Sequence, residues 1–375
     1  MALYALRFFT WGCWSVLFSF FAVWLTGVTP FSAAEVSVLA GTLALANRAG
    51  CLLCVRWVER CALRTLMLCT QAVLVLALLG LDGLYAAGNS NWWLWLPCAA
   101  LFGLASSVSS LAQLSFIASG QTRADTLTAF SLENVALNLS AGVTPYASAW
   151  VLNHCRAWYL LVPLLYVLPA LLLCLCLPNR PCGASTAQAP AAAPPAALAP
   201  WRFLLLNGLT FLAFSLFYNV FPLHAAGTLG AEQVGLLFAA SSALIVLLQV
   251  PLTRLSRGLG HTPLLLAANA SLALGLWALY SAHSHLGAAA LAIGLLTLAE
   301  MIFGPVYQAL AVRVFPGRPA RAMAIVTLTW ASAETLATAG GLYGVAQGQG
   351  LWVFAVGVAA ALLACALLRP RLSSA

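Results

Sequence analysis

Long apolar runs dominate this sequence and limit what it can fold into. Only 6% of the 375 residues are charged, whereas 63% are hydrophobic. A soluble globular domain carries roughly 25% charged residues, so a chain this poor in charge cannot cover a water-facing surface. Most of its surface must face lipid. A membrane-spanning helix needs about 20 mostly apolar residues, and this chain length therefore allows roughly a dozen spans.

The apolar runs predict an all-α integral membrane protein with twelve transmembrane helices. The first run is interpreted as the first helix of the mature protein, because no convincing small-residue cleavage site follows it. The predicted spans are residues 8–28, 36–56, 63–86, 92–119, 126–151, 157–178, 201–225, 233–254, 262–282, 287–312, 321–346 and 350–368.

Basic residues are distributed very unevenly between alternate loops. All sixteen are Arg; fourteen belong to one set of loops and termini, Arg156 belongs to the other set, and Arg48 lies inside a span. Cytoplasmic loops of membrane proteins carry the excess of basic residues. The bias therefore predicts an even number of spans, both termini in the cytoplasm, and a multi-pass location in the cell inner (plasma) membrane. The Arg residues form no patch or stripe, so nucleic acid is not expected as a partner.

An Ala- and Pro-rich segment at 178–200 interrupts the apolar pattern. It has one charge and no helical periodicity, which is typical of a flexible, partly extended linker. The predicted domains are an N-terminal six-helix bundle at 1–178, a cytoplasmic linker at 179–200 and a C-terminal six-helix bundle at 201–375.

The two predicted halves resemble each other at a nearly constant offset. Arg60 and Arg257 end the second span of each half and are 197 positions apart. Arg123 and Arg321 open the fifth span of each half and are 198 positions apart. This spacing indicates a duplicated six-helix unit in parallel orientation. Parallel halves are a known transporter architecture, with the substrate site between them near the bilayer midplane.

The loop after the second span reads Val55-Arg-Trp-Val-Glu59-Arg60-Cys-Ala-Leu-Arg64. It resembles the Gly-x-x-x-Asp-Arg-x-Gly-Arg-Arg motif of the major facilitator superfamily. Glu59 stands at the Asp position and Arg60 at the first Arg position, while the two Gly positions are lost to Val55 and Ala62. Together with the twelve-span layout and the linker, the motif makes the whole chain resemble that superfamily.

The resemblance implies a transporter with a cytoplasmic gate of charge pairs between helix ends. Glu59, Arg60 and Arg64 are the predicted gate residues. The equivalent loop of the second half, 255–260, departs further from the motif. Residues 123–145 resemble the fifth span of drug-efflux-type members, which favours export over import.

Three of the eight acidic residues lie inside predicted spans: Glu133, Glu300 and Glu334. A charged side chain at the bilayer centre costs about 2.5–3.5 kcal/mol on insertion scales, whereas a neutral carboxyl is tolerated more easily. Such groups can therefore take up and release protons, and all three are proton-coupling candidates. The alternative is a structural carboxyl bonded to a neighbouring helix.

Arg48 is the basic residue furthest inside a predicted span, directly after Asn47. It lies eight residues before the predicted end of that span, about 12 Å at 1.5 Å per residue. That is a long reach for a side chain to extend to the membrane surface. We therefore favour a role inside the bundle, where Arg48 pairs with an acid or an anionic substrate. The alternative is that its side chain extends to the membrane surface.

Other polar and aromatic side chains inside spans are candidates to line a substrate cavity. Amides in membranes often form interhelical bonds, which is the competing structural interpretation, and Trp also packs in cores or against lipid. The cavity candidates are Asn47, Arg48, Gln113, Asn134, Asn138, Tyr218, Asn219, Gln249, Tyr307 and Trp330.

These patterns favour a secondary active transporter over an enzyme. The sequence has no Gly-x-x-x-x-Gly-Lys-Ser/Thr motif, so ATP-driven transport is not expected, and no metal site or cofactor is predicted. We expect a monomer whose partners are a small-molecule substrate, protons or another coupling ion, and the lipid bilayer. The favoured function is proton-coupled export of a drug, siderophore or metabolite. The alternatives are a proton-coupled importer of a sugar or organic acid, a membrane-embedded enzyme, and a non-transporting sensor or scaffold.

Overall fold

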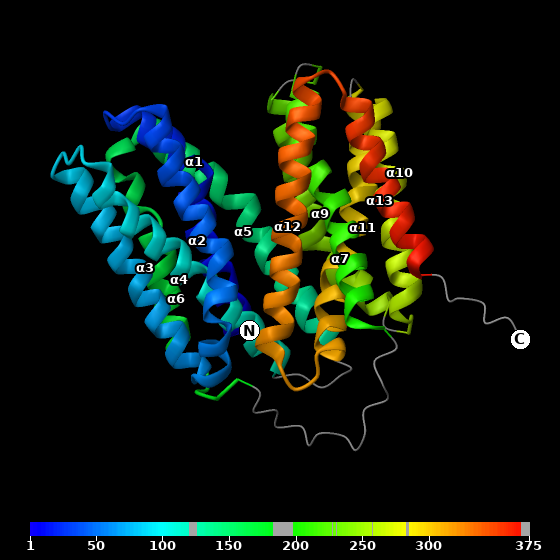
Figure 1. Ribbon diagram of the computed structural model, residues 1–375, viewed down its shortest axis with the longest axis horizontal. Helices are drawn as coiled ribbons and strands as arrows, with labels where there is room; N and C mark the ends of the chain where they lie inside the picture. The colour runs from blue at the N-terminus through cyan, green and yellow to red at the C-terminus, as the bar shows by residue number, and fades with distance from the viewer. Residues whose placement is uncertain are drawn as a thin grey trace, which may run out of the picture. The chain divides into compact units, whose positions relative to one another are not determined.

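The structure is a computed structural model that describes residues 1–119, 126–182, 198–226, 228–229, 231–256, 258–282 and 285–368. It is built from helices, and the predicted twelve-span fold is confirmed (Figure 1). The first six spans are α1 (Ala2–Val28), α2 (Ala33–Arg60), α3 (Leu63–Ala86), α4 (Trp92–Ser119), α5 (Thr126–His154), and η1 (Arg156–Leu161) with α6 (Leu164–Leu175).

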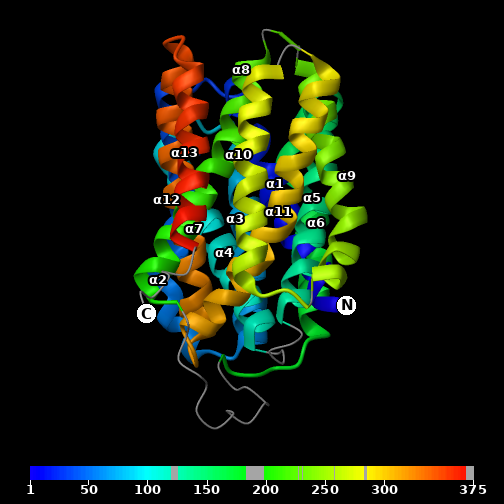
Figure 2. The same ribbon diagram turned by 90° about the vertical axis from the view of Figure 1, so that its right-hand side faces the viewer.

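The second six spans are also helical, and their helices face the viewer in Figure 2. The first of them is continuous through three elements, of which the middle one is a π-turn. The elements are α7 (Pro200–Ser215), η2 (Leu216–Val220) and α8 (Phe221–Ala226), then α9 (Ala231–Ser256), α10 (His261–Ala282), α11 (Leu286–Val314), α12 (Pro319–Ala346) and α13 (Gly350–Leu368).

Helix ends agree with local sequence signals. Ser32 caps α2 in a capping box, accepting from the Glu35 amide at 3.3 Å while the Glu35 carboxylate accepts from the Ser32 amide at 2.7 Å. Gly88, in the left-handed region with a φ of 61°, follows α3 and turns the chain towards α4. Linker residues 183–197, with Arg123 and Arg257, lie outside the described residues.

One terminal residue differs from the sequence prediction. The sequence predicts that the first span begins at residue 8, with Arg7 in the preceding segment. Helix α1 begins at Ala2, so Arg7 is helical and only 2% exposed. Its Nη1 donates to Ser110 Oγ on α4 at 2.9 Å, which gives the guanidinium a polar contact inside the bundle.

Ten helices in the described part of the chain are long and apolar enough to cross a membrane. The other two long helices, α5 and α12, have 29 and 28 residues. They are less apolar because each carries one Glu and several hydroxyl side chains, and α5 also carries three Asn residues. Each is the fifth span of its half, so the two halves also resemble each other in having a less apolar fifth span.

The chain divides into two compact units. The same helix pairs pack in both halves: α2 with α4, α3 with α4 and α1 with α6 correspond to α9 with α11, α10 with α11 and α7 with α13. Unit 1 holds Met1–Gln121, Ala136–Gln188 and Gly317–Ala324, and unit 2 holds Thr122–Val135, Ala189–Pro316 and Ile325–Ala375. The predicted domain boundaries at 178 and 200 stay predictions.

Buried polar nodes repeat at the offset predicted from the sequence. In unit 1, Gln71 of α3 donates to Ser109 of α4 at 2.9 Å. The residues 198 positions later are Asn269 of α10 and Tyr307 of α11. Both are within hydrogen-bonding distance of the Thr210 hydroxyl on α7, which donates to the Asn269 amide oxygen at 2.9 Å. Buried polar groups need such partners. The nodes therefore tie equivalent helices together in each half.

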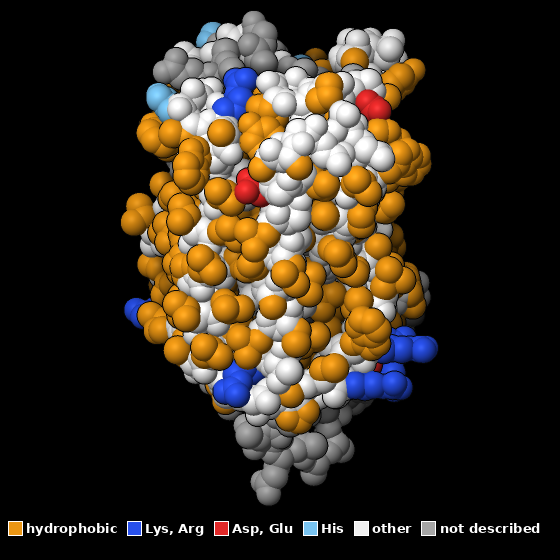
Figure 3. All heavy atoms as spheres, turned by 90° about the vertical axis from the view of Figure 1, so that its left-hand side faces the viewer, with side chains coloured by type: hydrophobic (Ala, Val, Ile, Leu, Met, Phe, Trp, Pro, Cys, Tyr) orange, Lys and Arg blue, Asp and Glu red, His pale blue; other side chains and the backbone are white. Residues whose placement is uncertain are grey.

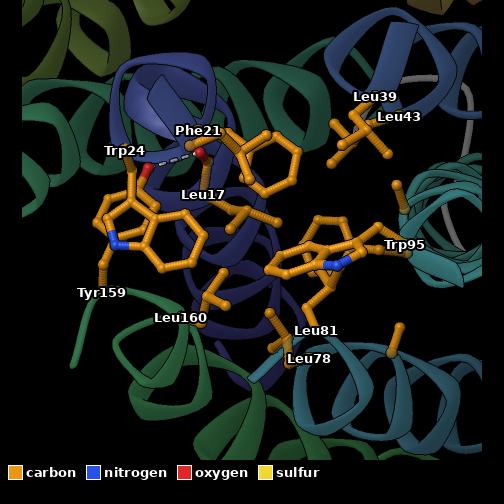
Figure 4. Packing of buried hydrophobic residues seen from close by; sticks show 14 of the residues in the cluster. Leu17, Phe21, Trp24, Leu39, Leu43, Leu78, Leu81, Trp95, Tyr159 and Leu160 are labelled. Carbon is orange, nitrogen blue, oxygen red and sulfur yellow. Dashed lines mark hydrogen bonds between the residues drawn. The ribbon is translucent and has the colours of Figure 1, made fainter. Parts of the chain in front are cut away.

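The core of unit 1 is aromatic at one end (Figure 4). The Trp24 ring stacks on Tyr159, with centroids 5.5 Å apart. The Tyr159 hydroxyl donates to the Leu17 carbonyl at 2.7 Å, so this fully buried side chain is satisfied. The cluster fastens η1 and α6 to α1.

Helices α2 and α4 approach each other closely at Gly103. A Cβ added there would lie 2.3 Å from the Leu43 carbonyl oxygen and 3.0 Å from the Asn47 amide nitrogen. Both are backbone atoms, so neither can turn aside. The Gly103 carbonyl also accepts from the Asn47 side chain at 3.4 Å. Only glycine allows this contact between two backbones.

One face of the molecule shows the membrane pattern directly (Figure 3). Hydrophobic side chains cover its middle, and most of the Arg side chains on this face gather towards its lower end. That distribution matches the Arg bias along the chain. The assignment of this end to the cytoplasm stays a prediction.

Labelling tests the predicted orientation. Ala199 is exposed just before α7, so Ala199→Cys, in a chain whose eleven native Cys are replaced, offers one thiol next to the linker. We expect an impermeant maleimide to label it in inverted membrane vesicles and not in intact cells. Efficient labelling from outside intact cells would contradict cytoplasmic placement.

Candidate functional site

The π-turn at Leu216–Val220 brings Tyr218 into the candidate site. The Phe221 amide donates to the Leu216 carbonyl five residues earlier, instead of four. Pro222 explains the widening, because it has no amide hydrogen and its ring would clash with the Tyr218 carbonyl four residues before it. Such turns within α-helices are frequent at functional sites.

Helix α12 packs tightly against this turn. A Cβ on Gly341 would lie 2.6 Å from the Val220 side chain. One turn away, the Asn219 amide donates to the Thr338 hydroxyl at 2.9 Å. The turn is therefore held by a close approach and a hydrogen bond to the same helix, which gives Tyr218 a defined position.

Glu300 and Glu334 lie near the middle of two spans of unit 2. Glu300 lies 14 residues from either end of α11, and Glu334 lies 15 residues into α12. Both side chains are partly exposed, and both carboxylates act electrostatically on the Tyr218 hydroxyl. A charged group at mid-span costs about 2.5–3.5 kcal/mol or more. This face of unit 2 is therefore expected to meet water or protein, and not lipid.

A continuous series of aromatic rings runs past the two acids. Phe211 stacks on Trp330 with centroids 4.9 Å apart and planes at 6°. Further along, Tyr218 meets Phe238 edge to face at 5.4 Å. Tyr218 is exposed and the other three side chains are partly exposed, whereas the rings between them are buried. We call the aromatic series the ring array; its members are Phe211, Phe214, Phe217, Tyr218, Phe238, Phe303 and Trp330.

Open space lies beside the acids. Gly304 is one helical turn from Glu300 and is buried. Among the described residues, no atom beyond its own helix backbone lies within 4 Å of a Cβ built at Gly304. Helix α11 continues through Pro305 without interruption. A small side chain at position 304 would therefore meet open space, one turn from Glu300 on an intact helix.

Two other predicted cavity residues have polar partners inside unit 2. The Trp330 indole donates to the Asn207 amide oxygen at 2.7 Å, which fixes the ring at one end of the array. Tyr307 is fully buried, with its hydroxyl 2.9 Å from Thr210. Trp330 therefore offers a ring face, whereas Tyr307 belongs to the buried node that joins α7, α10 and α11.

The start of α5 carries the third acid and belongs to unit 2. Asn134 donates to the Gln249 amide oxygen at 2.9 Å, so two predicted residues do meet. Glu133 is 1% exposed and accepts from Gln308 at 3.5 Å. The Thr253 hydroxyl donates to Ser131 at 2.8 Å. These bonds form a polar ladder separate from the ring array.

The predicted residues of unit 1 are dispersed. Arg48 is exposed on α2 and Asn47 contacts the Gly103 carbonyl. Gln113 is fully buried and donates to Thr10 and Ser109, both at 3.0 Å. Asn138 is partly exposed on α5.

Comparison with known proteins identifies the architecture. A family model described as Major Facilitator Superfamily matches residues 203–374. The human organic anion transporter MFSD10 (TETRAN) superposes with a TM-score of 0.75 at 16% identity, covering 98% of each chain. The chain has the major facilitator fold.

Two further solved structures share this fold. The proton:xylose symporter XylE gives a TM-score of 0.75 at 12% identity, covering 98% of this chain and 94% of that one. A bacterial homologue of the iron transporter ferroportin, in an outward-facing state, gives 0.72 at 16%, covering 98% and 97%. No curated protein sequence matches the chain. The fold of the predicted superfamily is thus confirmed, and its family model matches the C-terminal part of the chain.

The motif after the second span of this major facilitator fold lies at the end of α2. One Glu59 carboxylate oxygen is buried without a hydrogen-bond partner among the described residues, and Arg60 is exposed. Arg64 donates to the Leu177 carbonyl at 3.3 Å. The Leu63 amide donates to the Arg180 carbonyl at 2.9 Å. The segment after α6 is therefore fastened to the motif loop.

Two groups in this fastened segment have shifted pKa values. Arg180 donates to the Phe116 carbonyl at 2.9 Å and lies 3.9 Å above its ring, and burial lowers the pKa of the Arg180 guanidinium. Burial raises the pKa of the Cys182 thiol, and the charge of nearby Glu59 raises it further. The thiol therefore stays protonated and weakly reactive at neutral pH.

Substitution of Arg60 tests the predicted gate. We expect Arg60→Ala to slow transport about tenfold, comparable to losing a charge-assisted hydrogen bond, while substrate affinity stays close to wild type. Arg60→Lys keeps the topology-setting charge but cannot pair through two nitrogens, so it should also be slowed. Flux and binding measured on the same proteoliposomes decide this. Arg60→Ala transport at the wild-type rate would remove the gate role.

The ring array was missed by the sequence prediction. Its signal was present in one span, where Phe211, Phe214 and Tyr218 recur at intervals of three and four residues on one helical face. Phe238 and Phe303 lie on other helices, so no local pattern joins them to the array. Three-dimensional packing was needed to find it.

Proposed function

We propose that this protein is a secondary active transporter that exports a small organic molecule against its gradient by using protons. One observation carries the proposal: Glu300 and Glu334 lie at the middle of two spans of unit 2, and both side chains are partly exposed. Carboxyl groups in such places are typical of proton pathways in pumps and transporters.

Protonation would couple to movement through the cost of charge at bilayer depth. An ionised carboxylate favours a state in which water reaches it, whereas a neutral carboxyl tolerates closure. The two halves would rock about a central site, with Glu300 or Glu334 taking a proton on one side and releasing it on the other. Glu133 is the third candidate, on the separate ladder of α5.

The direction of transport is proposed from the motif resemblance of residues 123–145 to efflux-type members. Import is the second candidate, and the similarity of fold to a proton:xylose symporter supports it. Neither direction requires a cofactor or a catalytic site.

Transport by purified protein tests the proposal even with an unidentified cargo. Proteoliposomes with an imposed pH gradient are incubated with a cellular small-molecule extract, and their contents are measured by mass spectrometry. We expect at least one compound to accumulate only with protein and only while the gradient lasts. If no compound does so in either gradient orientation, proton-driven transport is wrong.

A further inference from the structure

We propose that Cys61 and Cys182 are an oxidation-sensitive pair, which closes to a disulfide between the loop after α2 and the segment after α6. Such a disulfide is a site of covalent modification and lies beyond the proposed transport activity. Three observations support it: the pairing of the two backbones, the positions of the two thiols, and the difference in their exposure.

The loop after α2 and the segment after α6 run antiparallel within unit 1. Ala62 pairs with Pro181 in an antiparallel bridge. At the next position, the Leu63 amide donates to the Arg180 carbonyl at 2.9 Å. One step forward along the first segment is therefore one step back along the second, and two consecutive positions agree on this register.

Cys61 and Cys182 are the next pair in the same register. Cys61 has an extended backbone, with a φ of −86° and a ψ of 155°. Opposite residues of an antiparallel pair have Cα atoms about 4.5–5.5 Å apart and side chains on the same face. Disulfides join residues whose Cα atoms are about 4.4–6.8 Å apart. The pair therefore suits a disulfide without a rearrangement of the backbone.

The surroundings of the Cys182 thiol agree with this pairing. Burial raises its pKa, and the charge of Glu59, which lies two residues before Cys61, raises it further. The interaction of a charge with a neighbouring group weakens with distance. The Cys182 thiol thus lies near the end of α2, where Cys61 follows.

The difference in exposure sets the order of the reaction, because Cys61 is exposed and Cys182 only partly so. The Cys61 thiolate attacks one oxygen of hydrogen peroxide; the O–O bond breaks, hydroxide leaves, and Cys61 becomes a sulfenic acid. The Cys182 sulfur then attacks the Cys61 sulfur, the S–O bond breaks, and the leaving hydroxide takes the Cys182 proton. Two thiols and one peroxide thus give one disulfide and two waters.

The predicted location makes the pair reversible. The loop after α2 is predicted to lie in the cytoplasm, where thiols are kept reduced and disulfides are mostly transient or redox-sensing. We therefore expect Cys61 and Cys182 to be reduced at rest and to close when peroxide rises.

Peptide mapping of the full-length protein tests the pair. Protein purified in detergent is reduced, desalted, treated with hydrogen peroxide, and mapped by mass spectrometry without further reduction. We expect a linked peptide containing Cys61 and Cys182 as the main disulfide, lost on addition of dithiothreitol. Absence of this peptide, or equal linkage of Cys182 to the exposed Cys69 or Cys176, would overturn the proposal.

Two variants provide a matched comparison. Of the eleven Cys, one variant keeps only Cys61 and Cys182, and the control keeps only Cys69 and Cys182. Cys69 is also exposed but lies six residues into α3, about 9 Å further along the helix.

Peroxide should remove both titratable thiols of the first variant, and dithiothreitol should restore both, whereas the control should form little disulfide. Thermal unfolding confirms that each variant is folded. Equal disulfide yields in the two folded variants would show that Cys61 and Cys182 are not a specific pair. The mapping needs no substitution, so it decides the proposal even where a variant does not fold.

Closing the pair would also restrain the predicted gate, because the disulfide fastens the residue after Arg60 to the segment that leads into the linker. On the proposed function, peroxide should slow flux in proteoliposomes, dithiothreitol should restore it, and Cys61→Ser should be insensitive. Equal inhibition of Cys61→Ser would remove this effect on transport. Disulfide formation is measured without cargo, so it stands or falls independently of transport.

Discussion

Replacing Glu300 and Glu334 together by Gln should reduce gradient-driven accumulation to the level of protein-free vesicles. Gln keeps the shape and hydrogen-bonding capacity of Glu but cannot exchange a proton, so the pH gradient would lose its connection to the conformational change. Exchange of cargo across the membrane without a gradient should continue, because it needs no net proton movement. The measurement is flux in proteoliposomes with and without an imposed pH gradient, using the compound found to accumulate with the wild-type protein.

Single variants and a control make this result specific. If one of the two acids carries the proton, its single Gln variant should reproduce the loss while the other retains most of the flux. Asp82→Asn removes an acidic charge from α3 of unit 1 and should leave both modes intact. Undiminished gradient-driven flux in the double variant would exclude these two acids and direct attention to Glu133 or to another coupling ion.

Gly103→Ala should destabilise the protein strongly for a change of one methyl group. The added Cβ would lie 2.3 Å from the Leu43 carbonyl oxygen, so α2 and α4 would have to separate along a contact that both backbones form. Overpacking of this kind costs about 1–3 kcal/mol. We expect a lower unfolding temperature and a smaller yield of monodisperse protein in detergent.

Gly294→Ala on α11 is the matched control. A Cβ at Gly294 meets no atom of the described residues within 4 Å, and Ala is favoured over Gly in helices by about 1 kcal/mol. Its unfolding temperature should equal or exceed that of the wild type. If both variants unfold at the same temperature, the α2–α4 contact is not a tight constraint.

The positions of the helices were largely predictable because lipid imposes a simple length and polarity rule. The predicted span 92–119 coincides with α4, and 63–86 with α3. The helix ends were less predictable. The charge of Arg7 suggests solvent and so a place before the first span, but the Ser110 hydroxyl on α4 allows it to enter the bundle.

The candidate site was predictable only in part. Glu300, Glu334 and Tyr218 stood out because polar groups are costly inside a membrane. The rings beside them did not stand out, because Phe is ordinary in any apolar run. Which Phe residues face the acids depends on how the helices are rotated. For Tyr218 that rotation includes a π-turn, which a regular 3.6-residue period cannot describe.

The modest apolarity of α5 and α12 has a consequence for how the protein is made. A nascent helix that carries ionisable and hydroxyl groups gains little by entering lipid alone. These two spans must therefore enter beside helices already in place, with Glu133 and Glu334 shielded from the start. Helix α12 has Arg318 just before it and Arg321 in its first turn, which retain that end on the basic side of the membrane. Insertion of the fifth helix would then limit the assembly of each half. Loss of Arg318 or Arg321 would reduce the yield of correctly inserted protein, before any cargo is bound.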